Sequence, residues 1–268
     1  MVLRPLGLPA PTADRVTPVT LQLQPLLMRT EMILDVLPIE ESLLVLGTEN
    51  LVLQHAGRTD SSRQVAAMTH SQPWPRDPRG RVWSDGASVQ VYLPGTQCKG
   101  TLRPLALSCA DSRESWPLDS GNATLVPDRN YFEAEGIRPF YSAVRLGAAE
   151  NPRRLIAAID GKSYLFNSNG ESMAVVDGLG SDLTAVQSGC GSGTQILAAI
   201  PGEASDSDFL EAYEWINLRA RPASPPMRMT GAITALWPLA GGTSAVAVAH
   251  NIEAGRYEAY RITIACSR

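Results

Sequence analysis

Two segments of this 268-residue chain repeat one pattern about 50 residues apart, and this repeat limits the possible folds more than any other feature. The first reads LTAVQSGCGSGTQILAAI from Leu183 and the second ITALWPLAGGTSAVAVAH from Ile233, and each is followed by an aromatic strand, FLEAYEW or RYEAYRI. The segment from Leu155 to Val176 has the same order of apolar and turn residues. A period of about 40 to 50 residues made of three or four strands is typical of β-propeller blades, which bury their faces only against neighbouring blades in a ring.

Strand patterns dominate the rest of the chain. Short apolar runs are separated by turn residues, as where Asp160-Gly161-Lys162 joins the runs 155–159 and 163–166, and we count roughly 18 to 20 such strands. The best helical candidate is 25–37, but prolines bracket it and its second half, 32–37, fits a strand equally well. We therefore predict an all-β propeller of about five four-stranded antiparallel blades with under about 10% helix. The alternative is a ring of six or seven blades with an incomplete N-terminus.

The repeat also predicts the boundaries of the blades. They are expected at about 32–72, 76–127, 130–178, 182–230 and 232–268, within a single propeller domain over 16–268. Residues 1–15 are expected to form an extended, proline-rich segment. The strict alternation from Val19 to Gln24 predicts a strand that completes the last blade and closes the ring.

Charge and hydropathy exclude some partners. The chain has 23 basic and 27 acidic residues, a net charge of −4, so it lacks the basic excess that nucleic-acid binding requires. Its apolar runs are far shorter than the roughly 18 to 20 residues of a membrane-spanning helix, and we predict no membrane insertion. Pro5 and Pro9 interrupt the apolar N-terminus, so no signal peptide is visible. We expect a monomer.

The four cysteines predict a compartment. Cys98 and Cys109 lie 11 residues apart, where two neighbouring antiparallel strands would bring them together. A bond between Cys190, in a glycine-rich turn, and Cys266 would fasten the terminal strand to the preceding blade. Two disulfides imply an oxidising compartment, so the chain is predicted to be periplasmic or secreted. The alternative is four free cysteines in a cytosolic protein.

One stretch resembles blades of known bacterial propellers. The sequence AIDGKSYLFNSNGE from Ala158 is similar to the centre of a blade in the PQQ-like family, and the 183–200 and 233–249 segments resemble FG-GAP (VCBS) blades. The resemblance covers about the last 115 residues and implies a bacterial propeller fold. It implies no ligand, because the chain lacks both the full Asp-x-Asp-x-Asp-Gly calcium loop and the tryptophan-docking blade endings of quinoproteins. We predict no cofactor.

Few residues stand out as a site. The loop 72–81 carries three prolines, and its binding candidates are Trp74, Arg76, Asp77 and Arg79, because Trp and Arg are enriched in binding hot spots. The alternative is a linker whose Trp74 fills the gap between two blades. The cluster of Glu203, Asp206 and Asp208 has no glycine turn at the offset a calcium loop needs, so we predict a solvated acidic loop and no metal site.

Three functions remain open. The first is a non-enzymatic, extracytoplasmic scaffold that binds a protein or a carbohydrate. The second is an enzyme like the propeller glycoside hydrolases, with catalytic carboxylates in the central pocket and Asp35, Asp160 and Asp182 as candidates. The third is the propeller domain of a pilus- or secretion-associated adhesin. No catalytic residue can be assigned from spacing, because active residues of a propeller converge from different blades.

Overall fold

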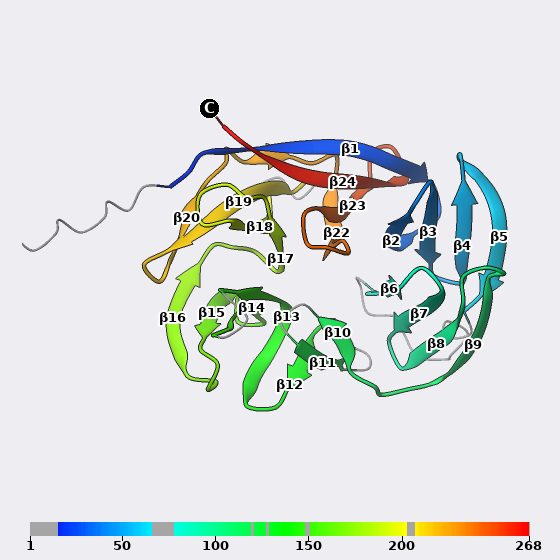
Figure 1. The fold of residues 1–268 in the computed structure, drawn as a ribbon, viewed down its shortest axis with the longest axis horizontal. Coiled ribbons are helices and arrows are strands. Elements are labelled where there is room, and N and C mark those ends of the chain that lie inside the picture. Colours follow the sequence, from blue (N-terminus) through cyan, green and yellow to red (C-terminus); the bar gives the residue numbers. More distant parts are fainter. Residues whose placement is uncertain are drawn as a thin grey trace, which may run out of the picture.

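Five antiparallel sheets arranged in a ring make up the computed structural model (Figure 1), which describes residues 16–65, 78–118, 121–126, 129–147, 151–202 and 207–267. No helix occurs among these residues, and hence none that could cross a membrane. Blade 1 contains β2 (Ile33–Ile39), β3 (Ser42–Gly47), β4 (Asn50–His55) and β5 (Arg58–Gln64). Blade 2 contains β6 (Arg81–Ser84), β7 (Ser88–Leu93), β8 (Thr96–Thr101) and β9 (Ala106–Asp111).

The other three blades follow the same order from the inner to the outer strand. Blade 3 contains β13 (Ile137–Leu146), β14 (Arg153–Ala158), β15 (Lys162–Phe166) and β16 (Ser172–Asp177). Blade 4 contains β17 (Asp182–Gln187), β18 (Thr194–Ile200), β19 (Phe209–Ile216) and β20 (Arg219–Pro222), and β21 (Met227–Arg228) pairs with β19. Blade 5 contains β22 (Ala232–Pro238), β23 (Ala245–Asn251), β24 (Arg256–Cys266) and β1 (Val19–Arg29). The predicted all-β propeller of about five antiparallel blades is confirmed.

Burial explains why apolar residues run continuously along the middle strands of a blade. In β18, Ile196, Leu197 and Ala198 are all fully buried, because both faces of the strand are covered by neighbouring blades. The outer strand β5 has the sequence RTDSSRQ and is exposed along most of its length. Charged residues on an exposed outer strand oppose edge-to-edge pairing with another chain.

The boundary between blades 2 and 3 differs from the prediction. The segment expected to finish the unit 76–127 instead forms β10 (Trp116–Leu118) and β11 (Gly121–Leu125), which extend the sheet of blade 3 through β12 (Phe132–Ala134). Trp116 lies 5.4 Å from Phe132 and 6.0 Å from Tyr92 of blade 2 between ring centroids. These aromatic contacts draw the three short strands into the space between the two blades (Figure 1).

The N-terminal strand closes the ring, as predicted. β1 pairs with β24 from Val19 opposite Cys266 to Arg29 opposite Tyr257, so blade 5 takes its outer strand from the beginning of the chain and the other three from its end. The N–H of Val19 also donates to the Ala223 carbonyl oxygen of blade 4 at 2.8 Å. The first described residues therefore join two blades.

Side-chain acceptors link successive inner strands. The N–H of the second residue in β6, β17 and β22 donates to a side-chain oxygen of the preceding blade at 2.7 to 2.8 Å. The pairs are Val82 with Asp35, Leu183 with Ser142 and Ile233 with Asp208. An inner strand has its other neighbours within its own sheet, so these bonds fix where each inner strand begins relative to the blade before it.

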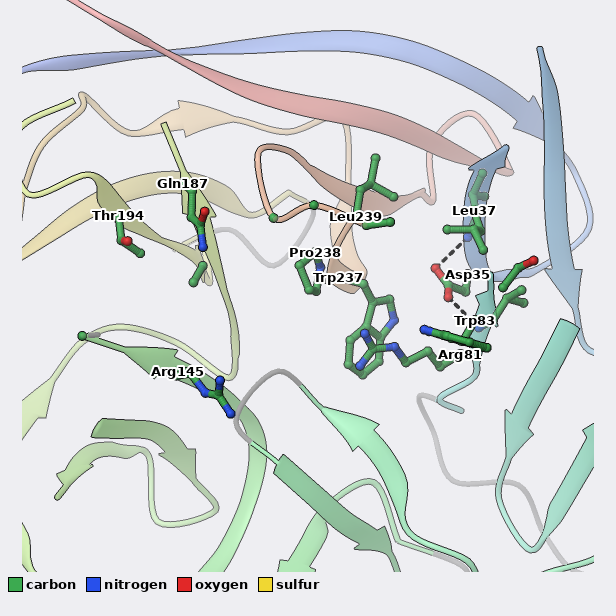
Figure 2. Close-up of a pocket in the computed structure, with 18 residues that line it drawn as sticks. Asp35, Leu37, Arg81, Trp83, Arg145, Gln187, Thr194, Trp237, Pro238 and Leu239 are labelled. Atoms are coloured by element: carbon green, nitrogen blue, oxygen red, sulfur yellow. Dashed lines mark hydrogen bonds between the residues drawn. The ribbon is translucent and has the colours of Figure 1, made fainter. Parts of the chain in front are cut away.

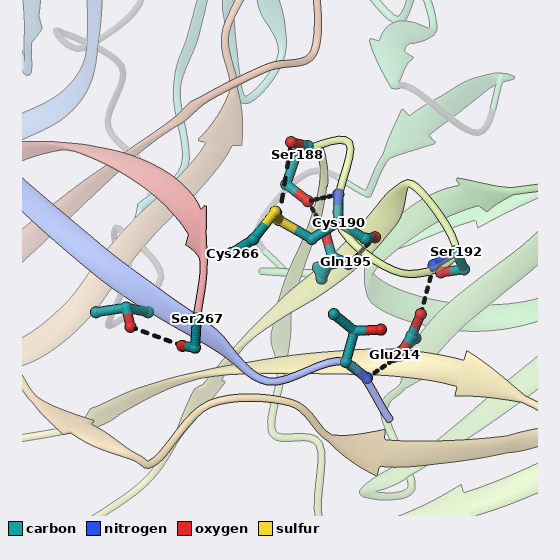
Figure 3. The surroundings of a disulfide bond; sticks show 9 residues. Ser188, Cys190, Ser192, Gln195, Glu214, Cys266 and Ser267 are labelled. Atoms are coloured by element: carbon teal, nitrogen blue, oxygen red, sulfur yellow. Dashed lines mark hydrogen bonds between the residues drawn. A yellow bond between two sulfur atoms is a disulfide. The ribbon is translucent and has the colours of Figure 1, made fainter. Parts of the chain in front are cut away.

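Both predicted disulfides are present. Cys98 and Cys109 face each other on β8 and β9 within blade 2. Cys190, in the loop between β17 and β18, is bonded to Cys266 at the end of β24, across the boundary of blades 4 and 5 (Figure 3). Glu214 holds the same loop, because its carboxylate accepts N–H groups from Ser192 and, at 2.9 Å, from Thr17.

The two disulfides are expected to contribute unequally to stability. Replacing Cys190 and Cys266 together by Ser should lower the free energy of unfolding by about 4 to 5 kcal/mol, and replacing Cys98 and Cys109 by about 3 kcal/mol. The reason is that the first bond closes a loop of 76 residues and the second a loop of 11. Urea unfolding of both double variants measures the difference. If the Cys190 and Cys266 variant lost no more free energy of unfolding than the Cys98 and Cys109 variant, the larger contribution expected of the longer loop would be contradicted.

Candidate functional site

A cavity of about 360 Å³ lies at the centre of the ring and is bordered by the inner strand of every blade (Figure 2). It collects the ends of β6, β13, β17 and β22 and the middle of β2. The loops that follow the inner strands, including 239–242, form its rim. We call this the central cavity, and we call the side of the ring that carries these loops the loop face. In open or closed β-folds, such convergent strand ends are frequent ligand sites.

Asp35 of β2 is the one carboxylate among the described residues that border the central cavity. One oxygen accepts the N–H of Val36 at 2.7 Å and the other accepts the N–H of Val82 at 2.8 Å. Burial raises the pKa of this carboxyl to about 6, although the two N–H donors and the Arg81 charge partly offset the effect. Through these two bonds Asp35 links β2 to the start of β6.

Arginine and tryptophan side chains also line the cavity, beside the neutral polar Ser84, Gln187 and Thr194. The guanidinium of Arg81 lies 4.8 Å from the ring centroid of Trp237, a distance at which the cation is attracted to the ring face. Arg145, at the end of β13, lies across the cavity from Asp35 and Arg81 (Figure 2). The indole N–H of Trp237 is buried and contacts no acceptor among the described residues. Arg81 and Trp237 are therefore packed on each other as a buried floor, with Arg81 also donating to the Pro117 carbonyl oxygen, and Arg145 is the exposed cation of the wall.

The rim of the cavity is held firmly on one side. The N–H of Gln187 donates to the Gly242 carbonyl oxygen at 2.7 Å, which joins the loops of blades 4 and 5. Three residues beyond Gln187, the disulfide at Cys190 fixes the same loop to Cys266 (Figure 3). Trp83 of β6 stands on the opposite side of the cavity, beside Asp35 and Arg81, and is 39% exposed (Figure 2). A rigid rim with an exposed aromatic side chain suits recognition, because little ordering is needed on binding.

Only one of the four predicted binding residues lies in the described structure. Arg79 is buried, where its guanidinium pairs with Asp182 of blade 4 at 3.1 Å and donates to Asn130 and the Tyr141 carbonyl oxygen. It therefore joins the entry to blade 2 with blades 3 and 4. Trp74, Arg76 and Asp77 lie outside the described residues, and their role in binding stays a prediction.

The structure does not bring the three candidate carboxylates of the hydrolase hypothesis together. Asp35 borders the central cavity, and Asp182 is paired with Arg79. Asp160 sits in the exposed turn between β14 and β15, where it binds Arg138 at 2.9 Å and Tyr164 at 2.7 Å. Glycoside hydrolysis uses two carboxylates that flank one bond. The described part of the cavity wall contains one carboxylate, Asp35.

Sequence reasoning did not identify Arg145 or Trp237 as site residues. Both lie on inner strands. The local sequence around an arginine or a tryptophan does not show whether its side chain faces the central cavity or points away from it. The useful signal was the blade period itself, since the ends of the inner strands of a propeller border its centre. Aligning the blades and listing those ends would have found both residues.

Comparison with known proteins supports the fold. No known family and no curated protein matches the sequence. A chain in the crystal structure of a mitotic checkpoint complex overlays with a TM-score of 0.52 at 10% identity, covering 97% of this chain and 98% of that one. The WD40 domain of Pan2 from Neurospora crassa gives 0.47 at 9% identity, covering 85% and 74%. BamB from Moraxella catarrhalis gives 0.40 at 12% identity, covering 84% and 71%. The overlay with the checkpoint-complex chain supports the fold alone, since 10% identity shows no shared function, and these comparisons do not identify the PQQ-like or FG-GAP type.

The titration of Asp35 predicts how stability depends on pH. Its pKa is higher in the folded chain, about 6, than in the unfolded chain, so the folded state retains the proton as pH rises from about 4 to about 6. Over this window Asp35 therefore lowers the free energy of unfolding, by at most about 3 kcal/mol. We expect the free energy of unfolding of the wild type, minus that of Asp35→Asn, to fall as pH rises from about 4 to about 6. Urea unfolding at several pH values measures it. A difference that is flat or rises would show that the carboxyl is not buried as described.

Proposed function

We propose that this chain is a non-enzymatic binding scaffold that receives a protein partner on its loop face. The observation that carries the proposal is the composition of the central cavity, to which all five inner strands contribute. Trp83 supplies partly exposed apolar area and Arg145 an exposed charged donor, whereas Arg81 is packed on Trp237 and donates to Pro117. Asp35, the one carboxylate in the described wall, accepts two backbone N–H groups. Such a wall can bind and orient a partner but offers no acid and base pair for catalysis.

A partner protein agrees with the shape of the site. The rim consists of loops from separate blades, so a partner would contact several parts of the chain at once. Aromatic and arginine side chains at the centre of such a surface are the types that carry most of the binding energy in protein interfaces. A carbohydrate remains an alternative outcome, because tryptophan faces and amide groups also recognise sugars.

We further propose an extracytoplasmic, periplasmic or secreted location. Two disulfides support this, and one of them holds a loop of the proposed binding face. Disulfides form and persist in oxidising compartments. An adhesin associated with pili or secretion would fit the same location and the same face, and its partner would identify it.

The loop 72–77 is a second proposed contact. It leads into Arg79, whose buried pairing with Asp182 anchors the entry to blade 2. A tryptophan between prolines near such an anchor would lose little conformational entropy on binding. We propose Trp74, Arg76 and Asp77 as a separate contact, because this loop precedes β6 and so belongs to the side of the ring where the inner strands begin, opposite the loop face.

Site-specific photo-crosslinking in the native host tests both proposals. We would replace Trp83, Trp74 or Ile252 with p-benzoylphenylalanine. Ile252 is the control, because it lies in the turn between β23 and β24, at the opposite end of β23 from the central cavity, and is 59% exposed. We expect one protein to be crosslinked from position 83 and not from position 252, and a product from position 74 would support the loop.

Three outcomes would overturn parts of this account. Equal crosslinking from positions 83 and 252 would contradict a preference for the loop face. No protein product from position 83, together with retention of the chain on a glycan array, would replace the protein partner with a carbohydrate. Absence of a product from position 74 alone would remove the loop from the binding surface and leave the loop face.

A further inference from the structure

A second cavity, of about 540 Å³, lies beside the central cavity on blade 3. It is bordered by the β13–β14 hairpin, the turn between β12 and β13, and the turn at 167–170 between β15 and β16. Its wall contains three arginines, Arg145, Arg153 and Arg154, and one acidic side chain among the described residues, Glu135. We call this cavity the blade-3 cleft.

The arginines are held close together by the strand register. Arg145 and Arg154 are direct partners on β13 and β14, so their side chains project from the same face of the sheet with their Cβ atoms about 5 Å apart. Gly121 leaves space for Arg154, because a Cβ at position 121 would lie 2.9 Å from Nη2 of its guanidinium. Burial, and then the charge of Arg145, lower the pKa of Arg154.

This arrangement is unfavourable for the isolated chain. Like charges directly opposite on neighbouring strands destabilise a sheet. Among the described residues, none of the three guanidinium groups forms an ion pair. An anion bound between Arg145 and Arg154 would remove the repulsion and supply the missing hydrogen-bond acceptors.

Arg145 borders both the central cavity and the blade-3 cleft. Together with Arg153 and Arg154 it forms an arginine track along blade 3, on a chain whose net charge is −4. A local charge opposite to the net charge of the chain favours a partner segment of the matching sign.

We propose that the track binds an acidic peptide segment of the partner protein, with carboxylates at Arg145 and Arg154. This inference rests on the proposed scaffold function and names the chemistry of its partner. A single phosphate would engage only the Arg145 and Arg154 pair, whereas a peptide with several carboxylates can also reach Arg153 in the same cleft. Ser168 in the cleft and Gln187 in the central cavity can pair with the backbone of an extended peptide.

Fluorescence anisotropy with a fluorescein-labelled hexaglutamate peptide tests the proposal at low ionic strength. We expect the full chain to bind hexaglutamate and not a hexaglutamine peptide of the same length. The double substitution Arg145→Gln and Arg154→Gln should weaken binding at least tenfold. The control Arg58→Gln removes an exposed arginine of β5 on blade 1 and should change binding less than twofold. Thermal unfolding checks that each variant is folded.

Each alternative result has a defined meaning. Equal losses in the Arg58 variant and the double variant would show non-specific attraction and overturn the proposal. Arginine-dependent binding of a heparin hexasaccharide without binding of hexaglutamate would replace the peptide with a sulfated glycan. Failure of hexaglutamate to bind, with a protein still crosslinked from position 83, would overturn the acidic partner and leave the scaffold function. If hexaglutamate binds through the arginines but no protein is crosslinked from position 83, the anion site is supported and the protein partner on the loop face is overturned.

Discussion

The pairing of β1 with β24 is the interaction on which the rest of the structure depends. A ring of blades that ends in an open strand would expose the edge of β24 and leave blade 5 with three strands. The first described residues prevent this, since they complete that sheet and also bond to Ala223 and Glu214 of blade 4. The disulfide between Cys190 and Cys266 lies at the same junction. Closure is therefore secured by main-chain pairing, a buried carboxylate and a covalent bond.

Closure has a direct consequence for the proposed binding surface. The inner strands are positioned by acceptors in the preceding blade, among them Asp35 and Ser142, so the ends of these strands come to the centre in a fixed arrangement. The central cavity is built from those ends, and the end of β13 also borders the blade-3 cleft. Repulsion between Arg145 and Arg154 can persist because the strand register, and not the side chains, determines their distance. A surface that carries such unfavourable charge pairs is the expected form of a site that awaits an anionic partner.

The sequence predicted the parts of this structure that repeat or are local. The similarity of the 183 and 233 segments indicated the blades, and the alternation of 19–24 indicated the closing strand. Spacing indicated the disulfide of Cys98 and Cys109, and the places of Cys190 in a glycine-rich turn and Cys266 in the terminal strand indicated the other. It did not predict β10–β12, because strands of three to five residues carry little pattern and these depend on aromatic contacts between distant residues. Nor did it separate a buried from an exposed arginine, so Arg79 was assigned to a binding loop although it pairs with Asp182. Arg145 and Arg154 lie opposite each other because of the pairing register of β13 and β14, and the sequence alone does not specify that register.

Native-state hydrogen exchange of the full chain tests the central claim most directly, because it reports the free energy at which each segment opens. If closure of the ring governs the fold, peptides covering β1 and β24 should exchange only through global unfolding, with the same opening free energy as β18 in blade 4 and the same dependence on denaturant. Exchange of β1 at a clearly lower free energy, while β24 and the inner strands remain protected, would show that the ring is stable without its closing strand and would contradict the account.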